Sequence, residues 1–255
     1  METNILLPKN HYNNLIFLGK GEYGTVYKAY DTKSNNYVCI KIIPKEKIDY
    51  DLYINEINIL KTIKTKYNIN YLDDFSDNLN HYLVTDLCDS TLEEELKKEN
   101  GFSVLKIKKI LIQLNEVFKF MHKNNIIYFD LHTENIFINY TNKLKTEFDI
   151  KLGDFGLARF KGETNTKLKL IFPLEEIYQM NLFSIGMLIF ELYFNEYIFK
   201  GKDDDETEDN LENLKINKLT GNKYLDYLII HLIKKMEDKN RMSWDEYLNY
   251  EFFKN

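Results

Sequence analysis

The stretch that decides the fold runs from Leu18 to Val26 and reads LGKGEYGTV. Apolar residues flank it on both sides, and a further apolar run, Tyr37–Lys41, ends in a lysine. This pattern predicts two strands joined by a glycine-rich turn, followed by a third strand. Glycine carries no side chain and tolerates most backbone angles, so the turn can approach another molecule closely through its backbone.

Three glycines of the turn, Gly19, Gly21 and Gly24, have the spacing G-x-G-x-x-G. That spacing alone is a weak signal, because it also occurs where a helix begins and binds a dinucleotide. Here no helix is predicted at the third glycine, which argues against a dinucleotide site. A glycine turn between two strands, with Lys41 ending the next strand, is typical of a segment that covers the phosphates of a nucleoside triphosphate.

The composition limits the kind of protein this chain can be. Its 255 residues are 44% hydrophobic and 15% aromatic, which suffices for one large domain or two lobes. A net charge of −6 gives no overall attraction for nucleic acid. Two cysteines, Cys39 and Cys88, are too few for a disulfide framework or a zinc site. We therefore expect reduced thiols in an intracellular protein, cytoplasmic or nuclear.

No targeting or membrane segment is predicted. Residues 1–4 lack a basic segment, and no long apolar run follows them, so a signal peptide is not expected. The longest apolar run, Leu182–Phe194, is interrupted by polar residues and is too short to span a bilayer. We interpret it as a buried helix and expect no membrane association.

The spacing of apolar residues changes along the chain. The first part is predicted to be mostly antiparallel sheet with one helix over residues 50–63, and beyond about residue 90 the pattern becomes mainly helical. The acidic segment Gly201–Asn210 is interpreted as an exposed loop. The predicted strands after the glycine turn cover residues 37–43, 69–72, 81–87, 136–138 and 150–152, and the later helices cover 103–123, 181–194, 223–236 and 243–249. A polar pair, Ser90-Thr91, is expected to cap a helix that follows it.

We therefore expect an α+β fold with two lobes in a single domain over residues 12–255. The small lobe, about 12–86, contains the antiparallel sheet and one helix. A hinge at about 86–90 connects it to a larger, mainly helical lobe at about 91–255.

Two polar clusters follow strands in the second part of the chain. Asp154-Phe155-Gly156 comes directly after the predicted strand 150–152, and Asp130 and Asn135 lie five positions apart on one loop. Carboxylate and amide oxygens are ligands that Mg²⁺ accepts, and a carboxylate can receive the proton of an acceptor hydroxyl. Together with the glycine turn, these residues indicate phosphoryl transfer.

In this order and spacing, the motifs resemble those of the eukaryotic-type protein kinases, and the resemblance runs from about residue 12 to 253. It rests on the glycine-rich loop, the strand motif Val38-Cys39-Ile40-Lys41, the helix glutamate Glu56, the catalytic-loop residues Asp130 and Asn135, the motif Asp154-Phe155-Gly156, the late arginine Arg241 and the closing Tyr250–Phe253. The resemblance implies the two-lobed kinase fold and the use of ATP and Mg²⁺.

The resemblance also implies a role for each matched residue. Lys41 would hold the α- and β-phosphates of ATP, and Glu56 would orient Lys41. Asp154 and Asn135 would hold Mg²⁺, and Asp130 would accept or orient the proton of the acceptor hydroxyl.

Residues around the adenine base follow from the same resemblance. Adenine would lie between Val26 and Cys39 on one side and Phe137 on the other. Thr85 would be the gatekeeper, small enough to leave a pocket behind it. The remaining contacts are expected from the glycine-rich loop (Leu18, Gly19, Lys20, Gly21 and Gly24) and from the hinge (Asp86 and Cys88). Four apolar residues match the family's regulatory spine and are expected in the core: Leu60, Leu72, Tyr128 and Phe155.

Two departures from the family pattern concern catalysis and its control. The usual H-R-D reads Tyr128-Phe129-Asp130, so the arginine that would pair with a phosphorylated loop is missing. We therefore do not expect phosphorylation of Thr164 or Thr166 to activate the chain through that residue. His132 takes the catalytic position of a lysine that normally faces the γ-phosphate. A neutral histidine supplies less positive charge, which predicts a slower enzyme, unless His132 simply packs within the loop.

Two further departures concern the acceptor side of the site. Asn181 replaces a buried aspartate, and the A-P-E motif reads Phe172-Pro173-Leu174-Glu175-Glu176, with fewer residues than usual before Asn181. Glu175 or Glu176 is the candidate partner of Arg241. This region normally shapes the platform for a protein acceptor, so the resemblance defines the substrate least well.

The leading hypothesis is an ATP- and Mg²⁺-dependent kinase that phosphorylates Ser or Thr of a protein substrate, because the family's principal catalytic groups are present. An alternative from another class is a nucleotide-binding pseudokinase that serves as an interaction module, given the departures in the catalytic loop. A third hypothesis is a kinase of small molecules or lipids. Neither nucleic acid nor a membrane is an expected partner, and the question of a regulatory partner stays open.

Overall fold

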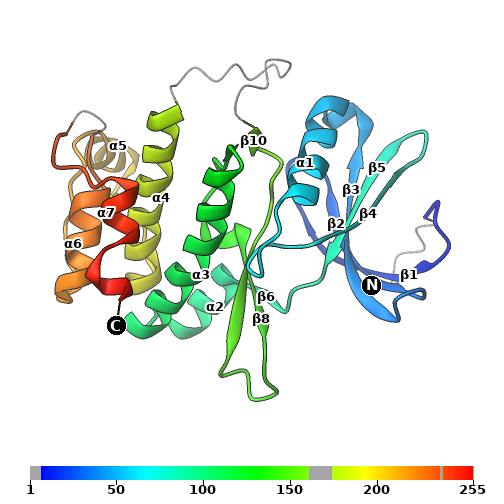
Figure 1. Ribbon diagram of the computed structural model, residues 1–255, viewed down its shortest axis with the longest axis horizontal. Helices are drawn as coiled ribbons and strands as arrows, with labels where there is room; N and C mark the ends of the chain where they lie inside the picture. Colours follow the sequence, from blue (N-terminus) through cyan, green and yellow to red (C-terminus); the bar gives the residue numbers. More distant parts are fainter. Residues whose placement is uncertain (1–6, 161–173, 236–237, 255) are drawn as a thin grey trace.

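The computed structural model describes residues 7–160, 174–235 and 238–254. Figure 1 shows two lobes, one a sheet with a single helix and the other a mainly helical body. The predicted α+β, two-lobed fold is therefore confirmed.

The first lobe is a five-stranded antiparallel sheet in the order β1-β2-β3-β5-β4. Its strands are β1 (Tyr12–Lys20), β2 (Thr25–Asp31), β3 (Asn36–Pro44), β4 (Tyr71–Ser76) and β5 (Asn80–Asp86). A short 3-10 turn, η1 (Lys45–Lys47), leads into α1 (Tyr50–Thr62), which packs against the sheet. The hairpin, the third strand and the helix predicted from the glycine-rich stretch onward are confirmed.

The sheet separates two groups of side chains, because neighbouring residues of a strand point to opposite faces. On one face, Ile40 belongs to a small core that the first lobe forms by itself. On the other face lie its neighbours Cys39 and Lys41, and Cys39 is in register with Thr85 of β5. The second face is the one that contributes to the candidate site.

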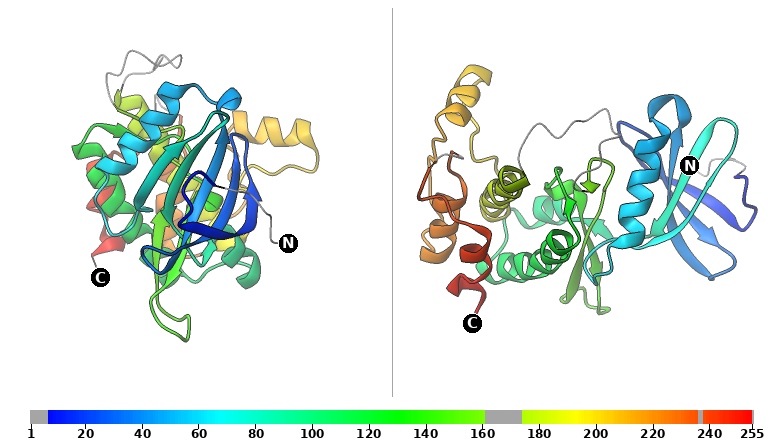
Figure 2. Two further views of the ribbon diagram at one scale, coloured as in Figure 1. Left: turned by 90° about the vertical axis from the view of Figure 1, so that its right-hand side faces the viewer. Right: turned by 45° about the horizontal axis from the view of Figure 1, so that its top comes forward.

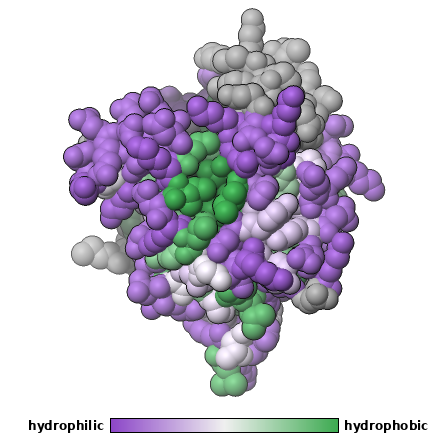
Figure 3. Space-filling model, turned by 90° about the vertical axis from the view of Figure 1, so that its left-hand side faces the viewer, coloured by the Kyte–Doolittle hydropathy of each residue, from purple (hydrophilic) through white to green (hydrophobic). Residues whose placement is uncertain are grey.

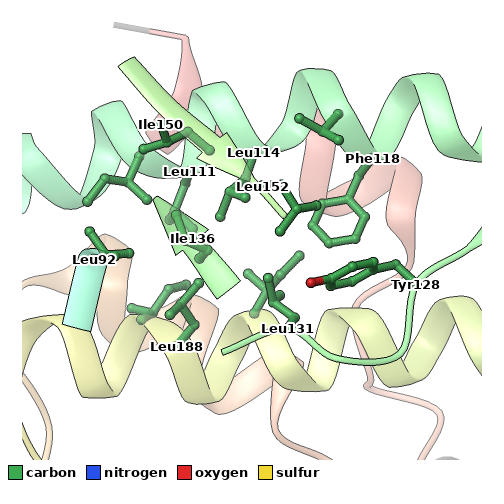
Figure 4. Close-up of a cluster of buried hydrophobic side chains, with 14 of the residues drawn as sticks. Leu92, Leu111, Leu114, Phe118, Tyr128, Leu131, Ile136, Ile150, Leu152 and Leu188 are labelled. Carbon is green, nitrogen blue, oxygen red and sulfur yellow. The ribbon is translucent and has the colours of Figure 1, made fainter. Parts of the chain in front are cut away.

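The second lobe packs its core between two long helices, α3 (Val104–Lys123) and α4 (Leu174–Phe194). Figure 4 shows side chains of β8 (Ile136–Tyr140) and β9 (Phe148–Leu152) between these helices. The strands form one sheet in the order β6-β8-β9 and a second, two-stranded sheet of β10 and β7. The remaining elements are β6 (Ser90–Thr91), α2 (Leu92–Glu99), β7 (Ile126–Ile127), η2 (Thr133–Asn135), β10 (Arg159–Phe160), α5 (Asp204–Glu212), α6 (Lys223–Leu232), α7 (Trp244–Leu248) and η3 (Glu251–Phe253).

Polar residues define where two of these helices begin. Thr91 forms a capping box with Glu94 at the start of α2, and Ser243 forms one with Glu246 at the start of α7. Such caps satisfy N–H groups that the first helical turn leaves free, and each contributes about 1 kcal/mol. The cap predicted at Ser90-Thr91 is confirmed, with Thr91 as the capping residue.

The interpretation of Gly201–Asn210 as a loop is wrong, because much of this segment belongs to α5. Asp203 caps the helix by accepting a hydrogen bond from the N–H of Glu206. Acidic residues near a helix N-terminus are stabilised by the helix dipole, so the same charges that suggested a loop favour a helix here. The two views of Figure 2 show α5 standing away from the rest of the lobe.

Several predicted boundaries also differ from the structure, among them those of β4, α4 and α6. Strand β4 begins at Tyr71, because Tyr67 and Ile69 instead exchange backbone hydrogen bonds of 2.8 and 2.9 Å with Leu152 of β9. Helix α4 begins before the predicted position 181, and α6 ends at Leu232.

The long apolar run Leu182–Phe194 is a buried helix, as predicted, since Leu182, Ile185 and Ile189 are fully covered. Within the described part of the chain, no helix is both long and apolar enough to cross a membrane. The face shown in Figure 3 is mostly hydrophilic, with one apolar patch near its centre.

Candidate active site

Lys41 lies between two carboxylates, the buried Glu56 and the exposed Asp154. Its Nζ is 3.5 Å from Oε1 of Glu56 and 3.6 Å from Oδ1 of Asp154. Strand β3 carries the lysine, α1 carries the glutamate, and Asp154 follows β9, so three elements meet at one ammonium group.

The charges of this cluster depend on one another. Burial by itself would lower the pKa of Lys41, but Glu56 and Asp154 outweigh it and raise that pKa, so the amine stays protonated. Glu56 is only 2% exposed, and burial raises the pKa of its carboxyl while Lys41 opposes the shift. Among the residues that the structure describes, Oε2 of Glu56 has no hydrogen-bond partner, so the positive charge of Lys41 is what compensates for burying this carboxylate.

The loop around η2 brings Asp130, His132 and Asn135 together. Nδ2 of Asn135 donates to the backbone oxygen of Asp130 at 3.0 Å and to its carboxylate Oδ2 at 2.8 Å. Nε2 of His132 lies 3.5 Å from the other carboxylate oxygen of Asp130, and its side chain is 40% exposed. The ring of His132 thus lies beside the carboxylate of Asp130, and its expected catalytic role stays a prediction.

Gly153 connects this loop to Asp154. Its N–H donates to the backbone oxygen of Asn135 at 2.9 Å, and its carbonyl accepts from the hydroxyl of Tyr128 at 2.8 Å. The next residue, Asp154, has a φ of +46°, a left-handed conformation that is uncommon for an aspartate and that surrounding structure must hold in place. The two candidate Mg²⁺ ligands, Asp154 and Asn135, are thus tied through one short backbone bridge.

The donor set fits magnesium held together with phosphates. Mg²⁺ is usually bound by one or two protein oxygens plus substrate phosphates, rather than by a cage of protein ligands. Asp154 and Asn135 offer one carboxylate and one amide on adjoining segments. Among the described residues there is no group of three or more His, Cys, Asp or Glu side chains that could hold a metal ion.

The residues expected around adenine lie on two elements. Cys39 and Thr85 face each other across β3 and β5, and burial raises the pKa of the Cys39 thiol to about 11. Val26 of β2 pairs with Lys41 on the same face of the sheet. Phe137 comes from the second lobe, on β8, and is half-buried.

The connection between the lobes carries Asp86 and Cys88. The carboxylate of Asp86 accepts from the backbone and side chain of Asn70 at 2.6 and 2.8 Å and lies 3.5 Å from Nζ of Lys151. Its side chain is therefore engaged in holding Asn70, which precedes β4, and Lys151 of β9 to the connection. Burial, with help from Asp86, raises the pKa of the Cys88 thiol to about 12, and both cysteines are free thiols.

The glycine-rich loop joins β1 to β2 and is closed by a hydrogen bond of 2.9 Å from the N–H of Gly21 to the carbonyl of Gly24. A methyl group added at Gly24 would lie 2.4 Å from the backbone oxygen of Ile42, whereas one added at Gly19 or Gly21 would meet nothing within 4 Å. Gly24 is therefore required by the fold itself, and the other two glycines leave open space above the loop. Leu18 and Lys20, which flank these glycines on β1, are both exposed.

The expected spine is only partly present. Leu60, Tyr128 and Phe155 are each at most 1% exposed, and the rings of Tyr128 and Phe155 meet edge to face at 5.4 Å. Leu72, however, is 49% exposed, so its assignment to the core is wrong. An irregularity in the pairing of β4 with β5, between Tyr71 and Asp73, turns this side chain outward.

The positions that depart from the family pattern are placed as follows. Phe129 is 36% exposed and Asn181 is buried at 4%. Arg241 donates to the backbone oxygen of Gln179 in α4. Thr164 and Thr166 lie outside the described residues, as do the side chains of Glu175 and Glu176, so the expected pairing with Arg241 stays a prediction.

Sequence reasoning missed three positions of this site. Oε1 of Glu191 accepts from the hydroxyl of Thr133 at 3.0 Å and so holds the catalytic loop from α4. Asn55 donates to the backbone oxygen of Ala158 at 2.8 Å, which ties α1 to the segment after Asp154. The third position is Gly153. The sequence could have indicated Glu191, since it is a charged residue within an apolar helix. It could not have indicated Gly153 or Asn55, because their contacts are with residues distant in the chain.

Comparison with known proteins agrees with this geometry. The protein kinase domain family matches residues 12–253. Cyclin-dependent kinase-like 1 of Caenorhabditis elegans is 36% identical over 157 residues, 60% of this chain and 43% of that protein. Cell division control protein 2 homolog 3 of Trypanosoma brucei brucei is 29% identical over 209 residues, 75% of this chain and 65% of that protein.

A third relative is the probable serine/threonine-protein kinase zyg-1 of Caenorhabditis elegans, 30% identical over 193 residues, 71% of this chain and 27% of that protein. The chain thus spans less than two thirds of the length of each of these relatives. With the family matched over nearly its whole length, this chain belongs to the protein kinase family.

Proposed function

We propose that this chain is an active protein kinase that transfers the γ-phosphate of ATP, with Mg²⁺, to a serine or threonine hydroxyl of a protein substrate. The observation that carries the proposal is the position of Lys41, within 3.6 Å of both Glu56 and Asp154. This arrangement supports the proposed roles of Lys41 in binding phosphate, of Glu56 in orienting it and of Asp154 in binding the metal. The choice of serine or threonine is supported by one relative, the probable serine/threonine-protein kinase zyg-1.

The catalytic groups would divide the work as follows. Lys41 would bind the α- and β-phosphates, and Asp154 and Asn135 would hold Mg²⁺, which neutralises phosphate charge when bound. Asp130 would accept the hydroxyl proton while the new P–O bond forms and the bond to ADP breaks. Asn135 donates to that same carboxylate and so fixes its orientation. His132 would add positive charge near Asp130 only when it is protonated.

The nucleotide base and sugar would be held by residues of both lobes. Val26, Cys39 and Thr85 would contact the base from the sheet, and Phe137 would contact it from β8. Leu18, Lys20 and the loop glycines would cover the phosphates through backbone contacts. Asp86 and Cys88 would offer backbone groups, since the carboxylate of Asp86 is already engaged. We place these parts in a single domain, residues 12–255, of an intracellular protein whose two thiols are reduced.

A second candidate is a pseudokinase that binds nucleotide and acts as an interaction module. Phe129 and Asn181, both altered from the family pattern, favour it, as does the histidine at position 132. A pseudokinase would still bind ATP, so binding alone does not separate the two candidates.

The deciding experiment measures transfer of the γ-phosphate from Mg·ATP to a mixed protein acceptor, with phosphoamino-acid analysis of the product. Asp130→Asn should abolish transfer. A matched control is Asp209→Asn, the same change at an exposed position of α5 whose carboxylate contacts Lys215 and Asn213, outside the proposed site. Transfer that the control retains and Asp130→Asn loses supports the kinase. ATP binding without transfer supports the pseudokinase. Transfer to lipids or small molecules, with none to protein, would mean that the proposed protein substrate is wrong.

A further inference from the structure

We propose that Gly153, which lies outside the family motifs identified in the sequence, determines the shape of the nucleotide-base site by leaving room for the ring of Phe137. The inference rests on the proposed nucleotide site between the lobes. It assigns base recognition to a residue that itself has no side chain.

The backbone of Gly153 is held from both sides and cannot easily move. Its N–H donates to the carbonyl of Asn135 at 2.9 Å, and its own carbonyl accepts from the hydroxyl of Tyr128 at 2.8 Å. Tyr128 is 1% exposed and Asn135 is 8% exposed, so both partners are fixed within the second lobe. Any side chain introduced at position 153 must therefore be accommodated by its neighbours.

Phe137 is the neighbour that would have to move. A methyl group at Gly153 would lie 2.6 Å from Cε2 and 3.1 Å from Cδ2 of Phe137, and 3.2 Å from Cδ1 of Ile69. A carbon separation below 3.0 Å is essentially never tolerated. The contact with Ile69 involves the end of a flexible side chain and needs a smaller adjustment.

The direction in which Phe137 can move follows from the pleat of β8. Its neighbours Ile136 and Ile138 are completely buried in the core of the second lobe, so Phe137 points to the opposite face. Lys151 is its partner on β9 and shares that face. Nζ of Lys151 lies 3.5 Å from Asp86 in the connection between the lobes, so this face is turned toward the proposed base site.

A displaced ring would therefore rise into the space of the base. With glycine at position 153, the ring of Phe137 keeps its observed position, and a purine can stack on its flat face. With alanine there, the ring would tilt or rise and clash with the base, while Lys41 and Asp154 could still bind phosphates. We therefore expect Gly153→Ala to lower the affinity for the base. The loss should be about tenfold or more, the effect of one misplaced methyl group.

The test measures dissociation constants for Mg·ATP and for adenosine, each by competition with a fluorescent ATP analogue. Four full-length proteins are compared: wild type, Gly153→Ala, Phe137→Leu and the double variant. Gly153→Ala should weaken ATP and adenosine by the same factor, because adenosine lacks the phosphates. In the Phe137→Leu protein, which has a smaller side chain, adding Gly153→Ala should cost little further affinity.

Each outcome decides the inference. If Gly153→Ala weakens ATP but not adenosine, the methyl group acts through Asp154 and the inference is wrong. If Ile69→Ala restores affinity to Gly153→Ala and Phe137→Leu does not, the wrong neighbour has been identified. Full affinity in Gly153→Ala overturns the inference while leaving the proposed function intact, whereas failure of the wild type to bind ATP overturns both.

If Gly153→Ala does not fold, the double variant decides the question. A double variant that folds and binds adenosine as tightly as Phe137→Leu supports the steric conflict between residue 153 and the ring of Phe137. A double variant that binds adenosine tenfold more weakly than Phe137→Leu refutes it.

Discussion

The ammonium of Lys41 and the carboxylate of Glu56 lie 3.5 Å apart, although β3 carries one and α1 the other. This contact fixes how the helix lies against the sheet at the point where phosphates would bind. Because Glu56 is buried, its carboxylate depends on Lys41 for charge balance, whereas Lys41 is also paired with Asp154. We therefore expect the pair to be the most sensitive feature of the proposed site.

Replacing Glu56 with glutamine should lower phosphate transfer by about 100-fold, because a small misplacement of Lys41 removes its alignment with the phosphates. The variant keeps the shape of the side chain, so it should remain folded. The measurement is kcat/KM for ATP, with circular dichroism as the check on folding.

The control for Glu56 is the ion pair of Lys66 and Asp149, 2.8 Å long, in which the lysine is 65% exposed. Asp149→Asn makes the same chemical change outside the site. Because the lysine is exposed and the pair is screened by solvent, the change should alter stability little and leave transfer unchanged. Full activity in Glu56→Gln, with Lys41 still required, would contradict the proposed role of the pair.

The substitution His132→Lys should increase kcat, on the order of tenfold, because lysine brings a permanent positive charge to the catalytic loop. The ring of His132 is 3.5 Å from Asp130 and 40% exposed, so a longer side chain has room to extend. Steady-state kinetics with saturating ATP measure the effect. His132→Gln, which cannot be protonated, serves as the neutral comparison and should be no faster than wild type. A lysine variant no faster than the glutamine variant would mean that charge at this position does not limit the reaction.

Much of the candidate site could be predicted because its residues occur in short motifs. The positions of Lys41, Asp130 and Asp154 relative to strands and loops follow from local spacing, and the structure brings them to one region. Local spacing could not predict the orientation of Leu72, because a one-residue irregularity between two strands decides which face it takes. The same limit applies to Gly153, whose importance depends on Phe137 and Ile69 from distant parts of the chain.

Charge alone misled the interpretation of the segment Gly201–Asn210. A run of acidic residues repels itself and suggests a loop, but the cap from Asp203 and the burial of Asn210 favour α5. The capping signal was present in the sequence, since an aspartate precedes a glutamate by three positions. Local hydrogen bonding therefore outweighed net charge in this segment.

Gly24→Ala should destabilise the fold, whereas Gly21→Ala should not. The added methyl at position 24 would approach the backbone oxygen of Ile42 to 2.4 Å, so β2 and β3 would have to separate, which we expect to cost about 1–3 kcal/mol. At position 21 the methyl meets nothing within 4 Å, so only a bound nucleotide would encounter it. Urea unfolding measures the stability of both variants, and ATP competition measures their binding. Equal stability losses for the two variants would contradict this division of roles.

The stability of the protein should fall as the pH decreases from about 4.5 to about 2, in part through Glu95. Burial alone would raise the pKa of this carboxyl, but hydrogen bonds from Lys98, Tyr140 and Ser90 outweigh it and lower the pKa to about 2. The folded state therefore binds the proton less readily than the unfolded state, whose pKa is near 4.5. Its contribution is complete above that value and is lost as the pH falls through the folded-state pKa.

The variant Glu95→Gln tests this linkage, because glutamine keeps the shape but does not titrate. Urea unfolding at a series of pH values between 6 and 2 should show a shallower loss of stability than in wild type. The difference between the two proteins should be greatest near neutral pH and should shrink toward pH 2. Parallel pH profiles would show that the carboxylate is not preferentially ionised in the folded state. The junction of α2 with β6 and β8 would then depend on packing instead of on the charge of Glu95.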